Sequence, residues 1–292
     1  MVTMIVITTP TGTIGASVAE SLYADELPLR VIARDPSALA QTLRSDADVI
    51  AGSHSDPIVL DAALSGADAV FVLVPPDLAA VDVAEHYLGF ARPIARAVRD
   101  HGVPRVVAVS SLGRGFAGPA GMLSAAWAMD EVLESSGAAY RSLQPAFFME
   151  NLLHQASLIR EQGVFVLPAE PDRPLAAAAT ADIARTAAGL LADPTWTGQD
   201  GVPVREPVDH TPNEMAQIMS DTLGRTIRFR QTSLDEYGAQ YAAFGASPAS
   251  ITGMIEMAEA QAAGVYPSVA PGGIGTGFAE WCELVLRPEL TR

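Results

Sequence analysis

Short apolar runs alternate in the first half of the chain with stretches where apolar residues recur every three or four positions. The run Met4–Ile7 is bounded by a Thr/Pro/Gly turn, and Ile14, Val18 and Leu22 then repeat every four positions. A short apolar run between turn residues predicts a buried strand, whereas the four-residue repeat predicts one face of a helix. The first twenty residues therefore predict a strand, a tight turn and a helix.

The same alternation continues to about residue 145. Strands are expected at 29–33, 49–51, 70–74, 105–109 and 140–143, with helices at 36–43, 56–64, 81–101 and 122–136. Parallel strands need a crossover connection, which alternating helices supply. The pattern predicts an α/β fold with a doubly wound parallel sheet of the Rossmann type.

Beyond Pro145 the pattern loosens. We expect helices at 147–160, 182–191, 211–224, 248–263 and through 286, strands at 202–204 and 226–230, and a Gly/Pro-rich segment at 264–277. These elements predict a smaller C-terminal α/β lobe that is intertwined with the first part of the chain. The Rossmann domain is expected at 1–150 and the lobe at 151–292, with parts of 176–206 packing back on the Rossmann sheet.

The composition of the chain argues against several classes of function. The net charge of −16 opposes binding to nucleic acid, which requires clustered cations. No apolar stretch approaches the ~18 residues of a membrane span, and no secretory signal is recognised, so a cytoplasmic protein is expected. The single Cys282 cannot form an internal disulfide, and no group of His, Cys or carboxylates has the spacing of a metal site.

The first turn carries a candidate phosphate cradle. Gly12 and Gly15 let the backbone approach a pyrophosphate, while the free N–H groups of the following helix point at the anion. The dinucleotide fingerprint has a glycine near the position of Thr9, so an ordinary strand-to-helix turn is the alternative interpretation. Arg34, nineteen positions after Gly15 at the end of the second strand, suits a ribose 2′-phosphate and favours NADP over NAD.

Several motifs follow one another in a recognisable order and spacing. They are Thr-x-x-Gly-x-x-Gly from Thr9, VIARDP at 31–36, GADAVFVLVPP at 66–76, VVAVSSLG at 106–113, QPAFFMENL at 144–152, DIAR at 182–185 and WTGQ at 196–199. In these motifs the chain resembles the NmrA-like family of atypical short-chain dehydrogenases over nearly its whole length. That family includes NADPH-dependent quinone and azo-type reductases, reductases of plant phenolics, and members that only sense NADP.

The resemblance, together with the rule that ligands bind at the carboxyl ends of parallel strands, implies a set of cofactor contacts. The pyrophosphate is expected at Thr9, Thr11, Gly12, Thr13, Ile14 and Gly15, the 2′-phosphate at Arg34 and Ser37, the adenine at Ser53 and His54, and the nicotinamide side at Val74, Pro75, Ser110, Pro145 and Phe147. Many family members have an Asp in place of Ser53.

Proton transfer has no obvious donor. Standard short-chain dehydrogenases use a Tyr-x-x-x-Lys pair, in which the ammonium lowers the pKa of the tyrosine. All 18 basic residues here are Arg, and Ala126 stands where many family members have a Lys. Ser111 and His154 are the candidate proton donors; a structural hydrogen bond for the serine and a surface position for the histidine are the alternatives.

An apolar substrate pocket is expected from Trp127, Phe148, Asn151 and Tyr266. The first hypothesis is an NADPH-dependent reductase of a small apolar conjugated carbonyl or quinone-like compound, acting as a monomer or homodimer. The second is a regulatory protein that senses NADP(H) without turnover and binds a basic protein partner through its acidic surface. A third is a biosynthetic isomerase or cyclase that keeps the cofactor as a scaffold.

Overall fold

A parallel sheet forms the centre of the computed structural model, which describes residues 4–267 and 275–291. Within those residues the sheet has seven strands in the order β10-β6-β5-β4-β1-β2-β3. Their bounds are Ile5–Ile7 (β1), Leu29–Ala33 (β2), Asp48–Ala51 (β3), Ala69–Val72 (β4), Arg105–Val109 (β5), Ala139–Pro145 (β6) and Gln199–Val204 (β10). Every pairing between them is parallel, which confirms the predicted doubly wound α/β fold.

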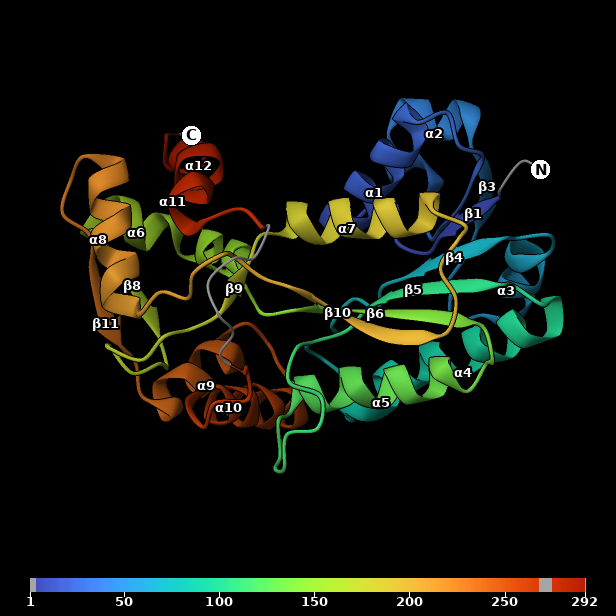
Figure 1. Cartoon of the computed structure of the whole chain (residues 1–292). Coiled ribbons are helices and arrows are strands. Elements are labelled where there is room, and N and C mark those ends of the chain that lie inside the picture. The colour runs from blue at the N-terminus through green and yellow to red at the C-terminus, as the bar shows by residue number, and fades with distance from the viewer. Residues whose placement is uncertain (1–3, 268–274, 292) are drawn as a thin grey trace.

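Helices cover both faces of this sheet (Figure 1). Ile5 and Ile7 of β1 pack on the face of α1 (Thr13–Ala24) and α7 (Thr180–Ala192). Val6 points to the opposite face, which is covered by α3 (Pro57–Leu64), α4 (Val83–His101) and α5 (Met122–Glu134). Because successive strand residues face opposite sides, an unbroken apolar run is what a strand buried on both faces requires.

The edge strand β10 belongs to the central sheet, although it follows several elements of the C-terminal lobe in the chain. It pairs with β6 in the register Gln199 opposite Tyr140 and Val204 opposite Pro145. The helix α7 that precedes it packs against α1, so residues 180–204 contribute a helix and a strand to the sheet layer. The helix expected at 182–191 and the edge strand expected at 202–204 are thereby confirmed.

The remaining elements form the C-terminal lobe, at the opposite end of the molecule from β3 (Figure 1). They are β7 (Phe147–Phe148), η2 (Met149–Gln155), α6 (Ala156–Gln162), β8 (Val164–Leu167), β9 (Ala177–Ala178), α8 (Pro212–Leu223), β11 (Arg228–Gln231), α9 (Leu234–Ala243), α10 (Pro248–Ala262), α11 (Phe278–Trp281), the π-helix η3 (Cys282–Leu286) and α12 (Arg287–Leu290). Phe165, Met215, Phe278 and Trp281 lie at the centre of its own apolar core.

Two stretches differ from the predicted elements. The prediction of a continuous helix at 147–160 was wrong, because Phe147–Phe148 pairs as a strand with Ala177–Ala178 before the chain enters a 3-10 helix. The side chain of Gln155 then bonds the backbone N–H and C=O of Val166, which ties that helix to the unpredicted strand β8. The helix expected at 36–43 is divided into a short 3-10 turn, Pro36–Ala38, and α2, Gln41–Asp46.

The segment expected to be irregular at 264–277 includes residues 268–274, which lie outside the described residues. By contrast, the helix predicted from Thr211 is confirmed as α8. Thr211 and Glu214 form a reciprocal capping box, and Gly224 ends the helix in a left-handed conformation. Within the described part of the chain, no helix combines the length and the apolar character needed to cross a membrane.

Candidate functional site

The order of the sheet reverses between β1 and β4, which lie side by side. In open parallel sheets a ligand binds at such a switch point, beyond the carboxyl ends of the strands. Here Thr8 connects the two strand ends, because its N–H donates to Phe71 O (3.3 Å) and its hydroxyl accepts the N–H of Leu73 (3.3 Å). The residues expected to bind the cofactor follow these strands and their neighbours.

The turn between β1 and α1 is closely packed. A Cβ on Gly15 would lie 2.0 Å from the carbonyl oxygen of Thr9, so this position excludes every side chain. Gly12 caps α1 without any side-chain hydrogen bond, and the first turn contains no acidic residue. Among the described residues the buried Thr9 hydroxyl has no hydrogen-bond partner. Free helix N–H groups beside an unpaired hydroxyl fit an anionic pyrophosphate.

Arg34 lies exposed at the carboxyl end of β2, the strand beside β1. No ion pair of Arg34 is found in the described ranges, and its positive charge lowers the pKa of His54. The hydroxyl and N–H of Ser37 instead donate to Asp35 Oδ1 at 2.6 and 2.9 Å, which lowers the pKa of that carboxyl group. The Arg34 guanidinium is therefore the group at this strand end that remains available to a phosphate.

His54 follows β3 and is buried against the ring of Phe90, with the ring centroids 4.5 Å apart. Burial, with further contributions from the positive charges of Arg34 and His86, lowers the pKa of His54 to about 4. The imidazole is thus neutral, and its buried Nε2 lacks a partner in the part of the chain that is described. Ser53 contacts its neighbour Ser55 through their hydroxyls at 2.8 Å. A neutral ring with an unpaired nitrogen fits an adenine edge.

The end of β4 is held by a histidine of α4. His86 Nε2 lies 2.9 Å from the carbonyl oxygen of Pro75, and Val74 beside it is buried. On the far side of β5, the carbonyl of Pro145 accepts the N–H of Leu112 at 3.0 Å, which brings the ends of β5 and β6 together. Val74, Pro75 and Pro145, three of the contacts expected on the nicotinamide side, therefore lie at the carboxyl edge of the sheet.

Ser110, directly after β5, uses its hydroxyl inside the protein. It donates to Asp130 Oδ2 at 2.7 Å, and the same carboxylate accepts the hydroxyls of Ser142 (2.9 Å) and Tyr140 (2.5 Å). Asp130 is fully buried, and burial raises its pKa against these hydrogen bonds. The sequence interpretation missed this residue, although a lone carboxylate on the apolar face of α5, between Ala126 and Leu133, is a signal that could have revealed it.

Ser111, the next residue, donates its hydroxyl to the carbonyl of Leu112 at 3.3 Å and lies beside Trp127. Its carbonyl accepts the indole N–H of Trp127 at 3.1 Å, and its hydroxyl acts on Tyr266 to lower the pKa of the phenol. The phenol oxygen of Tyr266 accepts the amide N–H of Gln261 at 3.1 Å. The structure thus brings together Ser111, Trp127 and Tyr266, which are far apart in sequence.

The other expected pocket residues are placed less centrally. Phe148 packs on the core of the sheet and Phe147 on the core of the C-terminal lobe. Trp127 is itself buried among Leu123, Ala260 and Val265, and so forms a wall between α5 and α10. Asn151 and His154 are exposed on η2, and neither has a hydrogen bond to another candidate residue within the described ranges.

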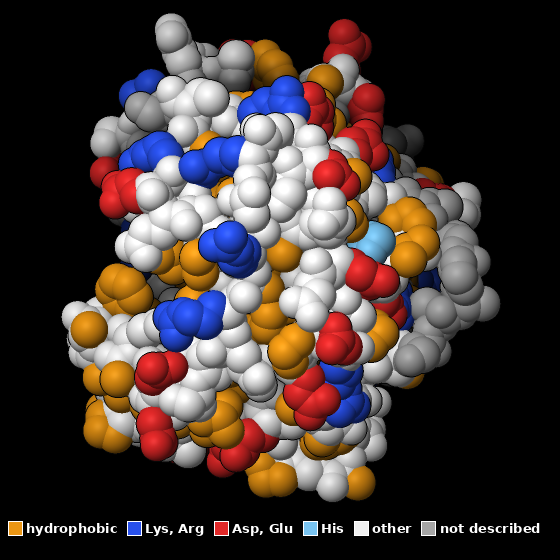
Figure 2. Space-filling model, turned by 90° about the vertical axis from the view of Figure 1, so that its left-hand side faces the viewer, with side chains coloured by type: hydrophobic (Ala, Val, Ile, Leu, Met, Phe, Trp, Pro, Cys, Tyr) orange, Lys and Arg blue, Asp and Glu red, His pale blue; other side chains and the backbone are white. Residues whose placement is uncertain are grey.

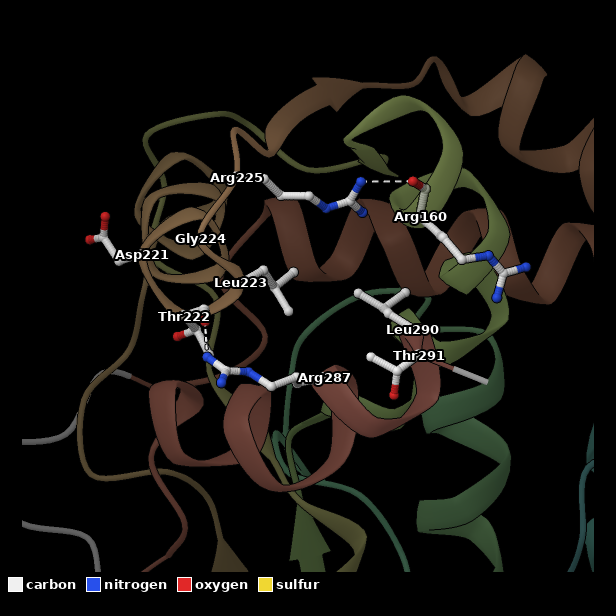
Figure 3. Close-up of a pocket in the computed structure, with 9 residues that line it drawn as sticks. All are labelled: Arg160, Asp221, Thr222, Leu223, Gly224, Arg225, Arg287, Leu290 and Thr291. Carbon is white, nitrogen blue, oxygen red and sulfur yellow. Dashed lines mark hydrogen bonds between the residues drawn. The ribbon is translucent and has the colours of Figure 1, made fainter.

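A hollow of about 710 Å³ lies elsewhere, at the outer end of the C-terminal lobe (Figure 3). Arg225 donates to the carbonyl of Arg160 at the end of α6 (2.7 Å), and Arg287 donates to that of Thr222 at the end of α8. These guanidinium groups cap helix carbonyls. On the same face of the molecule arginines and carboxylates are interspersed (Figure 2), so we assign this hollow a structural role.

The fold and the glycine turn are those of a Rossmann-type protein that binds a dinucleotide. Comparisons with known proteins lead to the same class. The model of the NmrA-like family matches residues 1–263, and the chain belongs to that family. It is 30% identical over 235 residues to an NAD(P)H azoreductase of Xenophilus azovorans, covering 80% of this chain and 78% of the other. It is 32% identical over 273 residues to a (4-alkanoyl-5-oxo-2,5-dihydrofuran-3-yl)methyl phosphate reductase of Streptomyces griseus subsp. griseus, covering 92% and 90%.

Two solved structures share the fold over nearly their whole length. An NADPH-dependent quinone oxidoreductase of Escherichia coli, complexed with NADPH, superimposes with a TM-score of 0.77 at 24% identity, covering 95% of this chain and 98% of the other. The triphenylmethane reductase of Citrobacter sp., complexed with NADP(H), superimposes with a TM-score of 0.78 at 19% identity, covering 99% of each chain.

Proposed function

We propose that this protein is an NADPH-dependent reductase of small, apolar, conjugated compounds such as quinones and unsaturated carbonyls. It is an oxidoreductase that uses a nicotinamide cofactor, as the names of its 30% and 32% identical relatives support. The observation that carries the choice of NADPH is Arg34, whose guanidinium stands at the end of β2 without an ion pair in the described residues.

In this proposal residues 1–150 bind the cofactor and the lobe 151–292 covers the substrate. The N-terminus of α1, with Gly12 and Gly15, holds the pyrophosphate, and Arg34 pairs with the 2′-phosphate. When bound, NADPH supplies a hydride to an electrophilic carbon of the substrate. The neutral ring of His54 accompanies the adenine, and Val74 and Pro75 border the nicotinamide ribose.

The aromatic wall supports an apolar substrate. Trp127 and Tyr266 meet beside Ser111 at the end of β5, so a flat conjugated molecule placed there would contact rings and have hydroxyls within reach. Ser110 is a poor choice of proton donor because its hydroxyl proton is engaged by Asp130. Ser111 and Tyr266 remain free of that carboxylate.

A sensor that binds NADP(H) without turnover is the second candidate, and one observation favours it. Ala126, where many family members have a lysine, is buried on α5, and no lysine occurs anywhere in the chain. The Tyr-x-x-x-Lys chemistry of standard short-chain dehydrogenases is therefore excluded. A sensor would bind the cofactor and leave every acceptor unreduced.

The test is a titration of the purified protein with NADPH and with NADH, in which binding is measured by the fluorescence of the nicotinamide. Consumption of the bound cofactor is then measured against a panel of quinones, enones and azo compounds. Preferential binding of NADPH with turnover on the panel supports the reductase. Binding without turnover supports the sensor, and absence of binding would contradict both.

A further inference from the structure

We infer that the hydroxyl of Tyr266, held by Gln261, is the acid that protonates the reduced substrate. This inference rests on the reductase proposed above and assigns its missing proton donor. Tyr266 lies on the segment that follows α10, far in sequence from the helix that carries the tyrosine of standard short-chain dehydrogenases.

The position of Tyr266 follows from close backbone packing. A Cβ on Gly113 would lie 2.5 Å from the carbonyl oxygen of Val265, so the residue before Tyr266 rests directly on the loop that leaves β5. In Figure 1, α10 lies beside the end of α5 where that helix begins, and the two helices contact each other. The C-terminal lobe therefore delivers a phenol to the carboxyl edge of the sheet, where the cofactor is expected.

Packing fixes the ring of Tyr266 in place. The side chain of Tyr266 contacts three separate apolar clusters, centred on Trp127, on Leu112 with Ala146, and on the core of the C-terminal lobe. Tyr266 is only partly buried, in contrast to Tyr140, whose fully buried hydroxyl is bonded to Asp130. A ring fixed on several sides holds its hydroxyl in one position, as proton donation to a bound molecule requires.

The partners of the hydroxyl prepare it for that role. Gln261 Nε2 donates to the phenol oxygen at 3.1 Å, and this bond stabilises the phenolate that is left after proton transfer. Burial raises the pKa of Tyr266, and Gln261 and Ser111 both oppose that rise. Tyr266 in turn raises the pKa of Tyr237 on α9. The phenol is thus protonated at neutral pH and is hydrogen-bonded in both states.

The balance of the step is simple. The substrate receives two electrons with the hydride. Its oxygen becomes negatively charged and accepts the proton of the Tyr266 hydroxyl. The phenol O–H bond breaks as the O–H bond of the product forms. The phenolate then regains a proton from water, which restores the phenol for the next turnover.

The decisive comparison is Tyr266→Phe against Tyr23→Phe. Tyr23 lies on α1, where its hydroxyl donates to Asp46, so this variant removes a phenol outside the site. For an unsaturated ketone, Tyr266→Phe is expected to lower kcat by about 10²–10⁴-fold, the usual effect of a general acid, with KM and NADPH affinity nearly unchanged. The loss should be smaller for a quinone, because the hydroquinone anion is a weaker base than an alkoxide and needs less acid assistance.

A second variant tests the mechanism without removing the phenol. Gln261→Met deletes the hydrogen bond to the phenol oxygen, so the pKa of Tyr266 should rise. The high-pH limb of the kcat profile, where activity is lost as the acid ionises, should then move to higher pH. Ultraviolet difference titration of tyrosinate, with Tyr266→Phe as the blank, should show the same shift in protein that is not turning over.

The outcomes separate this inference from the proposed function. Unchanged kcat in Tyr266→Phe for the unsaturated ketone, while the wild type turns over, overturns the role of Tyr266 and leaves the reductase standing. Equal losses for ketone and quinone, with an unshifted pH limb in Gln261→Met, indicate a packing role and also overturn it. Failure of the wild-type protein to oxidise NADPH with any acceptor overturns both.

Discussion

The hydroxyl of Ser110 donates a 2.7 Å hydrogen bond to Asp130, a carboxylate without solvent exposure. Two further hydroxyls, from Tyr140 and Ser142, complete the ring of donors around it. These bonds join α5 to the residue that follows β5 and to the first half of β6. Ser110 thereby fixes the backbone that presents Ser111.

Replacement of Asp130 should lower the free energy of unfolding more than replacement of its neighbour Glu131. Asp130→Ala removes the acceptor of three buried hydroxyls, of which Ser110 keeps a second acceptor in the carbonyl of Ala126 at 3.4 Å. At about 1–3 kcal/mol for each hydroxyl left unpaired, we expect a loss of roughly 3 kcal/mol. Glu131→Ala, next in sequence but exposed, should change the free energy of unfolding by less than about 0.5 kcal/mol. Urea denaturation followed by circular dichroism measures both, and equal values for the two variants would contradict the role of the cluster.

The choice of cofactor should depend on Arg34. A charge-assisted hydrogen bond contributes about 1.5–3 kcal/mol, so Arg34→Ala should weaken NADPH binding by roughly 10- to 100-fold and leave NADH binding nearly unchanged. Arg99→Ala is the matched control, because Arg99 lies in the last turn of α4. Fluorescence titration gives both affinities; a similar loss for NADPH and NADH would mean that Arg34 does not contact the 2′-phosphate.

The glycine turn should tolerate no side chain at Gly15. Gly15→Ala places a methyl group against the carbonyl of Thr9, and overpacking of this kind costs about 1–3 kcal/mol. The same substitution at Gly89, within α4 and with open space around it, should be neutral or stabilising by up to about 1 kcal/mol. Thermal unfolding of the two variants, together with NADPH titration, tests whether the turn sets both stability and binding.

Glu206 should make stability fall with rising pH. Burial raises its pKa to about 8, against the N–H of Phe278 that bonds its carboxylate at 3.1 Å; Asp209 adds to the rise and Arg205 opposes it. His210 lies 3.7 Å from the same carboxylate. The folded protein keeps a proton that the unfolded chain releases above pH 4.5, so the stabilisation is complete below that pH and is lost toward pH 8.

The slope should not exceed ~1.4 kcal/mol per pH unit for one group. Glu206→Gln preserves the shape of the neutral acid and cannot ionise, so its free energy of unfolding should vary less between pH 5 and pH 8. Urea denaturation at several pH values gives the two slopes. Parallel slopes for wild type and variant would show that other groups set the pH dependence.

Local pattern was sufficient to predict the central sheet. The apolar runs at 29–33 and 105–109 are strands with those same bounds, since a strand buried on both faces has an unmistakable composition. The helix beginning at Thr211 was predicted equally well, because its capping box is a local signal. Phe147–Phe148 was mistaken for helix because its strand partner, Ala177–Ala178, lies far along the chain and no local signal reports that pairing.

The candidate site likewise contains residues that local spacing predicts and residues that only the tertiary structure brings together. The glycine turn and Arg34 follow from spacing within thirty-four residues, whereas the partners of Ser111 come from α5 and from the end of α10. Tyr266 was predicted as a pocket residue, but its bond with Gln261 joins residues five apart across a helix end, which periodicity does not reveal. Asp130 was missed because its three partners lie on two neighbouring strands.

The pairing of β10 with β6 has a consequence for the newly made chain. Because β6 ends at Pro145 and its outer neighbour ends at Val204, the backbone groups along that edge of β6 have no strand to pair with until the ribosome has released the intervening residues. During that interval β6 presents an open edge, which is a template for pairing with another nascent chain. Synthesis of β10 ends that interval, because its pairing along residues 199–204 covers the open edge of β6.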